Sequence, residues 1–187
     1  MSRIKPADIS KNPDLKAMFD MAEQNMGFSP EDGKIMAHNP DILNAVGGLV
    51  ASVLNNGSVA PGTKRLIGFM TSQSSGCHYC SAHSSHGALG HGISEDQLNA
   101  IWEYESCDLF SNKEKAAIRV AHKAGMVPNA TEQEDIDELK KYYTDAEVIE
   151  IVSTIGLYGF FNKFNHTLGT DIEEKPKRSY ERVKKKR

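Results

Sequence analysis

The densest group of reactive side chains in the sequence lies between Cys77 and His86. Cys77 and Cys80 are three positions apart, and His78 and His83 lie in the same stretch. Side chains at i and i+3 share one face of a helix, so the two sulfurs can reach disulfide distance with a modest adjustment. The spacing therefore predicts a redox-active dithiol with a histidine partner, placed at the start of a helix.

A helix N-terminus would favour the thiolate form of such a pair. Its unpaired N–H groups and partial positive charge lower the pKa of a cysteine. The thiolate is the nucleophile in peroxide reduction and in thiol–disulfide exchange. His83 follows Cys80 by three positions, and an imidazole there can accept the thiol proton near neutral pH. By the dipole argument alone, Cys77 is the attacking sulfur because it lies nearer the helix start.

Two other hypotheses fit the same stretch. A zinc ion needs four nitrogen or sulfur ligands, and the stretch offers Cys77, Cys80, His83 and His86. Zinc sites usually take two ligand pairs from separate segments, which this chain does not offer. Alternatively, both cysteines are buried structural residues and the histidines lie at the surface. We interpret His78 as an exposed bystander, and Cys107, which has no partner nearby in the sequence, as structural.

The composition predicts one globular domain in the cytoplasm. The chain has 187 residues, of which 39% are apolar and 25% charged, a balance that is typical of a folded protein. No apolar run reaches the ~20 residues of a membrane-spanning helix, and the N-terminus lacks the apolar core of a signal peptide. Three cysteines are too few and too unevenly placed for a disulfide framework, so the close pair favours catalysis or metal binding.

The net charge of −3 is unevenly distributed along the chain. Residues 175–187 hold eight Lys or Arg and one Glu, so this tail carries +7 and residues 1–174 carry −10. An acidic body argues against nucleic acid as a partner. We expect a single helical domain over residues 1–174 and a basic, flexible tail over residues 175–187. The alternative for the tail is a patch that binds an anionic surface or a targeting receptor.

The helix signals extend over nearly the whole chain and predict an all-α fold. Asn12-Pro13 and Asn39-Pro40 each combine a capping residue with a proline of the first turn. Pro61 opens a further helix, which leads into the dithiol stretch. Four capping boxes follow, at Ser94/Gln97, Ser111/Glu114, Thr131/Glu134 and Thr144/Glu147. The last of these helices has apolar residues on several faces, which indicates a central helix or one buried between subunits.

The segment Gly76–His83, preceded by an apolar helix with Lys64-Arg65-Leu66 near its start, resembles the carboxymuconolactone decarboxylase/alkylhydroperoxidase (AhpD-like) superfamily. The likeness runs from about Pro40 to Pro176. It implies an AhpD-like helical bundle, a homo-oligomer (trimer or hexamer), and a Cys-x-x-Cys pair that acts on peroxides. It also implies that Cys80 is oxidised to the sulfenic acid, that Cys77 resolves it, and that His83 is the base.

The chain departs from this family pattern at two positions. The well-described members carry a relay Glu twelve residues before the first cysteine, where this chain has Arg65. They also carry the histidine four residues after the second cysteine, where this chain has Ser84. Either His83 works with another acid or the peroxidase activity is weak. Arg65 could stabilise a thiolate, bind an anionic substrate, or simply be exposed.

The sequence thus predicts a thiol-dependent peroxidase-like antioxidant protein that uses Cys77, Cys80 and His83. Its partners would be a peroxide and an external thiol reductant, with no membrane and no nucleic acid. This chemistry needs no cofactor, neither flavin nor haem. The alternatives are a non-redox, decarboxylase-like enzyme and a zinc-stabilised oligomer without enzymatic activity.

Overall fold

The computed structural model describes residues 1–184, and no β-strand occurs among them. The first half contains α1 (Pro13–Met26), α2 (Glu31–Met36), α3 (Pro40–Val50), α4 (Pro61–Ser74) and α5 (His78–Gly90). The second half contains α6 (Glu95–Asn99), α7 (Asn112–Gly125), α8 (Gln133–Leu139), α9 (Asp145–Leu168) and α10 (Glu174–Lys184). Short helical turns lie at Ile9–Lys11, Ala51–Asn55 and Ile101–Glu103. The predicted all-α fold is confirmed, and none of the described helices could span a membrane.

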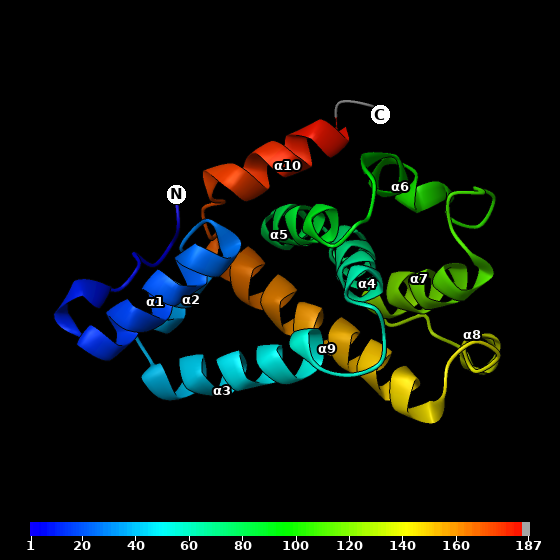
Figure 1. The fold of residues 1–187 in the computed structure, drawn as a ribbon, viewed down its shortest axis with the longest axis horizontal. Helices are drawn as coiled ribbons and strands as arrows, with labels where there is room; N and C mark the ends of the chain where they lie inside the picture. The colour runs from blue at the N-terminus through cyan, green and yellow to red at the C-terminus, as the bar shows by residue number, and fades with distance from the viewer. Residues whose placement is uncertain (185–187) are drawn as a thin grey trace.

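The two Asn-Pro pairs begin helices as expected. The side chain of Asn12 accepts hydrogen bonds from the N–H groups of Asp14 and Leu15, at 3.0 and 3.2 Å. The side chain of Asn39 accepts one from the N–H of Ile42 at 3.2 Å. Each cap satisfies a donor that has no partner within its own helix. The helices α1, α2 and α3 together form the blue-to-cyan end of the molecule in Figure 1.

The centre of the fold is built from α4, α5 and α9, and α4 packs against both of the others. The apolar positions expected in α4 are almost fully buried: Leu66, Ile67, Phe69 and Met70. Helix α9 crosses the middle of the molecule, with α3 on one side and α4 and α5 on the other (Figure 1). Helix α5, which begins just after Cys77 and contains Cys80, therefore packs against the main core through α4.

A close approach between α4 and α9 depends on Gly68. A Cβ atom at this position would lie 2.1 Å from the ring of Tyr158, so only glycine fits. The ring of Tyr158 thereby lies across α4, and its hydroxyl reaches the guanidinium of Arg65 at 3.5 Å. Gly68 thus helps to position the side chains of Tyr158 and Arg65.

Three of the four predicted capping boxes are present, at Ser94/Gln97, Ser111/Glu114 and Thr144/Glu147. The fourth prediction was wrong by one position: the box at α8 pairs Glu132 with Asp135. Asp135 also accepts a hydrogen bond from Lys123 of α7 at 2.8 Å. This tertiary contact accounts for the register, because it fixes Asp135 rather than Glu134 at the third helical position.

The basic C-terminal stretch differs from the flexible tail that we expected. Helix α10 extends to Lys184 and packs on α5 and α6. Its buried face carries Tyr180 and Val183, at 8% and 2% exposure, while Arg178 lies on the exposed face. The pattern of apolar and basic residues is that of an amphipathic helix. The expectation for residues 185–187 lies outside the described residues.

Candidate active site

The turn between α4 and α5 places the two cysteines at a helix start, as predicted. Gly76 adopts a left-handed conformation (φ = 69°), which a residue with a side chain rarely takes. The next residue, Cys77, is the N-cap of α5, and Cys80 lies in its first turn. Both are buried and both are free thiols.

The two thiols differ in acidity. The thiol of Cys80 donates a hydrogen bond to the sulfur of Cys77, and this lowers the pKa of Cys77 to about 7. The backbone N–H groups of Cys80 and Tyr79 act in the same direction and burial opposes them. The pKa of Cys80 is raised, first by its hydrogen bond to Cys77 and then by burial. The negative charge of the pair therefore lies on Cys77 and the proton on Cys80.

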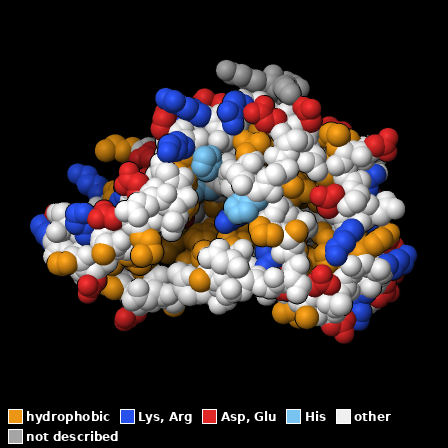
Figure 2. Space-filling model, in the orientation of Figure 1, with side chains coloured by type: hydrophobic (Ala, Val, Ile, Leu, Met, Phe, Trp, Pro, Cys, Tyr) orange, Lys and Arg blue, Asp and Glu red, His pale blue; other side chains and the backbone are white. Residues whose placement is uncertain are grey.

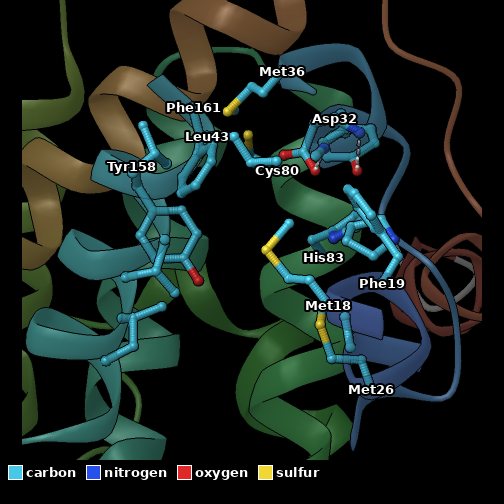
Figure 3. Close-up of a pocket in the computed structure, with 18 of the residues that line it drawn as sticks. Met18, Phe19, Met26, Asp32, Met36, Leu43, Cys80, His83, Tyr158 and Phe161 are labelled. Carbon is cyan, nitrogen blue, oxygen red and sulfur yellow. Dashed lines mark hydrogen bonds between the residues drawn. The ribbon is translucent and has the colours of Figure 1, made fainter. Parts of the chain in front are cut away.

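Cys80, unlike Cys77, lines a cavity of about 300 Å³. The cavity lies between α5 and the N-terminal helices (Figure 3). Its wall is largely apolar and comes from α1, α2, α3, the turn after α3 and α9: Met18, Phe19, Met26, Met36, Leu43, Val46, Val50, Leu54 and Phe161. Figure 2 shows apolar side chains inside a hollow near the middle of one face, with histidine side chains beside it. The space suits the apolar part of a small molecule.

His83 also lines the cavity and is held by a carboxylate. Its Nε2 lies 2.6 Å from Oε2 of Glu173, in the segment just before α10. Oε1 of Glu173 accepts hydrogen bonds from the Tyr79 hydroxyl at 3.0 Å and from the Glu31 N–H at 2.6 Å. The ring of Tyr79 stacks on His83, with 4.1 Å between the ring centroids. Glu173 and Tyr79 therefore fix the orientation of the imidazole.

Glu173 is the acid that the sequence analysis missed. Burial alone would raise its pKa, but the hydrogen bond and the charge of His83 hold the pKa below its usual value. The carboxylate is thus anionic at neutral pH and can stabilise a protonated imidazole. Ninety positions separate the two residues. The family resemblance extended to this segment but gave Glu173 no role, so only the tertiary structure reveals the pair.

A second carboxyl group, Asp32 of α2, lines the cavity next to Cys80. The side-chain amide of Asn165 bridges the two, at 3.3 Å from Oδ2 of Asp32 and 3.7 Å from Sγ of Cys80. Burial raises the pKa of Asp32, although His83 and Asn165 partly oppose this effect. A carboxyl group with a raised pKa can hold a proton close to the sulfur. No local sequence pattern pointed to Asp32 or Asn165.

The structure separates the remaining histidines from the thiols. His78 is exposed at the start of α5. Nδ1 of His86 lies 2.9 Å from the hydroxyl of Ser179. Burial lowers the pKa of His86. Across residues 1–184, no three His, Cys, Asp or Glu side chains are grouped so that they could hold a metal ion. The zinc hypothesis therefore lacks the converging ligands that it requires. Cys107 is half-buried and packs against the main core, far from α5 in sequence.

Arg65 occupies the position at which the family pattern has its relay acid, and it lines the same cavity. A side chain at Gly87 would approach Cδ of Arg65 to 3.2 Å, so Gly87 leaves room for the arginine against α5. Arg65 is half-buried. The site thus combines a dithiol, a His–Glu pair, an aspartic acid and an arginine around one apolar cavity.

Known proteins resemble this chain in sequence and in fold. The sequence model of the carboxymuconolactone decarboxylase family matches residues 40–123. The crystal structure of the debrominase Bmp8 is 30% identical, with a TM-score of 0.88, and the match covers 96% of this chain and 97% of that one. A cysteine-to-alanine variant of that debrominase was solved in complex with 2,3,4-tribromopyrrole.

Two more distant proteins share the fold or part of the sequence. A peroxidase-related protein from Ralstonia eutropha JMP134, described as an alkylhydroperoxidase AhpD core, is 20% identical with a TM-score of 0.81, over 94% of both chains. The protein YdfG of Bacillus subtilis (strain 168) is 22% identical over 114 residues, which cover 60% of this chain and 78% of YdfG. The family model and the 30% identity to a solved structure over nearly the whole chain show that the chain belongs to the carboxymuconolactone decarboxylase family.

Proposed function

We propose that this protein is a dithiol oxidoreductase that reduces organic hydroperoxides, with Cys77 and Cys80 as the redox pair. The observation that carries the proposal is the position of Cys80, which lines an apolar cavity while its thiol is hydrogen-bonded to a more acidic cysteine. Hydrogen peroxide would not need an apolar cavity of this size. An organic hydroperoxide would place its carbon skeleton there.

In the first step, Cys80 attacks the terminal peroxide oxygen. The O–O bond breaks, Cys80 becomes a sulfenic acid, and the alkoxide takes a proton and leaves as an alcohol. The proton of the Cys80 thiol passes to Cys77 or to His83, which lines the cavity with its Nε2 on Glu173. Asp32 is placed to protonate the alkoxide, because it lies beside Cys80 and its pKa is raised. Proton transfer by such a positioned group contributes roughly 100- to 10,000-fold to a rate.

In the second step, Cys77 attacks the sulfenic acid. An S–S bond forms between the two cysteines and water leaves, so the two electrons taken by the peroxide come from the two thiols. An external thiol or dithiol then reduces the disulfide. The three-residue spacing at the start of α5 supports this role, because it keeps Cys77 close enough to Cys80 to capture the sulfenic acid before further oxidation.

The assignment of Cys80 as the attacking sulfur rests on access, since acidity alone favours Cys77. The test is mass spectrometry of Cys77→Ser and Cys80→Ser after one equivalent of cumene hydroperoxide. We expect a sulfenic acid on Cys80 in Cys77→Ser and little oxidation of Cys77 in Cys80→Ser. A stable sulfenic acid on Cys77, with none on Cys80 in the converse variant, would reverse the roles.

A second candidate reaction is reductive removal of a halogen from an aromatic ring. It is favoured by the likeness to a debrominase over nearly the whole chain and by a cavity that fits a small ring. The carbon–bromine bond would be replaced by a carbon–hydrogen bond, bromide would leave, and the two thiols would become a disulfide. Bromide release from a polybrominated pyrrole, measured beside cumene hydroperoxide consumption, separates the two reactions. A non-redox, decarboxylase-like reaction would instead survive in Cys77→Ser.

A further inference from the structure

Arg65 is a cation on the wall of a largely apolar cavity. The ion pairs of residues 1–184 give it no carboxylate partner. Its Nη1 donates a hydrogen bond to the hydroxyl of Tyr158 at 3.5 Å. An arginine keeps its charge in proteins, and a half-buried charge without a counterion is costly. A ligand that brings a negative charge would remove this cost.

Two groups near the cavity are arranged to receive an anion. The guanidinium of Arg65 has donors beyond the one that contacts Tyr158. Because the Tyr158 hydroxyl accepts from Arg65, its own proton is left to be donated to a ligand. Gly68 and Gly87 make room for the two side chains. Arg65 and Tyr158 both line the cavity that Cys80 lines.

The other groups that face the cavity are compatible with an anion at this position. Asp32 and His83 are its remaining ionisable side chains beside Tyr79 and Cys80. Burial raises the pKa of Asp32, which weakens its repulsion of a bound anion. Glu173 is already engaged with His83, Tyr79 and Glu31. Among the described residues that line the cavity, Arg65 is the cation that no carboxylate pairs with.

We propose that the cavity selects amphipathic organic acids, with the anionic group bound by Arg65 and Tyr158 and the apolar body against the methionine and phenylalanine wall. The reducible bond of such a substrate would then lie against Cys80. This inference deepens the proposed redox function by naming its substrate class. The binding part of the inference stands independently of that function.

Binding is tested on the reduced protein with decanoate and decanol, which share an apolar chain and differ in charge. Isothermal titration calorimetry should give at least a tenfold tighter Kd for decanoate. Arg65→Met should remove this difference, Arg65→Lys should keep part of it, and Tyr158→Phe should weaken decanoate binding several-fold. Lys141→Met is the matched control, because it removes the same net charge from an exposed position just after α8. Its affinities should equal those of the wild type.

Equal affinity for decanoate and decanol, or unchanged decanoate binding in both Arg65→Met and Tyr158→Phe, would overturn the inference. Because both Arg65→Met and Tyr158→Phe are measured, the test remains valid if one of them fails to fold. Circular dichroism checks the fold of each variant. The redox part is tested separately, with the hydroperoxide of linoleic acid and its methyl ester. The acid should react faster, and Arg65→Met should abolish this preference. If decanoate binds through Arg65 and neither hydroperoxide oxidises the thiols, the proposed function fails while the anion site stands.

Discussion

At the scale of residues, the proposed function divides between two cysteines the work that a single reactive cysteine would do alone. Cys77 carries the charge because it is the helix N-cap and accepts a hydrogen bond from Cys80. Cys80 is the sulfur that a ligand can reach, because it lines the cavity. In the proposed mechanism, transfer of the Cys80 proton to Cys77 makes the accessible sulfur nucleophilic. His83, held by Glu173, lines the same cavity and is the proposed acceptor of that proton.

The acidity of Cys77 predicts a pH dependence. Its pKa is lowered to about 7, so the thiolate of the pair should form as the pH rises through 7 rather than through the usual value of 9.0. The rate of alkylation by iodoacetamide in Cys107→Ser, followed from pH 5 to 10, should show this midpoint. Cys80→Ala removes the hydrogen-bond donor at position 80 and should move the midpoint of Cys77 upward. A single midpoint near 9 in both proteins would contradict the assignment.

The link between Glu173 and His83 gives a second prediction at this scale. Glu173→Gln keeps the size of the side chain and removes the charge that orients and stabilises a protonated imidazole. We expect peroxide-dependent thiol oxidation to slow by roughly tenfold or more, with a shift of its pH profile, and with thermal stability within a few degrees of the wild type. Glu174→Gln, at an exposed neighbouring position, is the control and should leave the rate unchanged. An unchanged rate and pH profile in Glu173→Gln would exclude a role in proton transfer.

How much of the site could be predicted from the sequence depends on how local each contact is. The positions of Cys77, Cys80 and His83 followed from spacing within one helix, and most caps followed from pairs three residues apart. Glu173, Asp32 and Asn165 could not be found in this way, because they reach α5 from distant segments of the chain. The error at α8 has the same origin, since Lys123 of another helix fixes the position of Asp135. The helix at residues 174–184 was missed because its basic face outweighed two buried residues, Tyr180 and Val183.

At the scale of elements, the junction of the Ala51–Asn55 turn, α4 and α9 depends on one buried cation. Lys64 of α4 is 1% exposed. Its Nζ donates to the carbonyl oxygens of Val53, at 2.8 Å, and of Asn56. It also lies 3.0 Å from Oε2 of Glu150 in α9. This junction holds the cavity wall formed by Leu54 against the helix that carries Tyr158 and Phe161.

Removing that cation should therefore destabilise the fold. In Lys64→Met the carboxylate of Glu150 loses its counterion and two carbonyl groups lose a donor. We expect the free energy of unfolding to fall by about 3 kcal/mol, as for other broken buried ion pairs. Lys141→Met, which breaks an exposed pair with Glu138, should cost at most about 0.5 kcal/mol. Urea denaturation followed by circular dichroism measures both, and equal losses would contradict this account of the junction.

At the scale of the whole molecule, one face of α9 presents apolar side chains to solvent. Ile149, Val152 and Phe160 are 66%, 46% and 39% exposed. They lie on one side of the helix, and the space beside Gly156 is open. We propose that this face contacts another copy of the chain, in keeping with the trimer or hexamer that the sequence resemblance implies. Helix α9 would then serve both the core of one subunit and the contact between subunits.

This arrangement predicts an assembly that a single charge disrupts. Light scattering should give a mass that is three or six times the 20.6 kDa of the chain. Val152→Glu should shift the protein towards the monomer, because a carboxylate would be buried in the contact. Gln133→Glu adds the same charge at an exposed position of α8 and should leave the mass unchanged. A monomeric wild type at micromolar concentration would refute the contact.

The central claim, that Cys77 and Cys80 form a substrate-driven redox pair, is tested most directly by counting thiols. Reduced Cys107→Ser is titrated with a thiol reagent under denaturing conditions, before and after one equivalent of cumene hydroperoxide. The account predicts the loss of two thiols per chain and their full recovery with dithiothreitol. Retention of both thiols across a series of hydroperoxides and brominated pyrroles would contradict it.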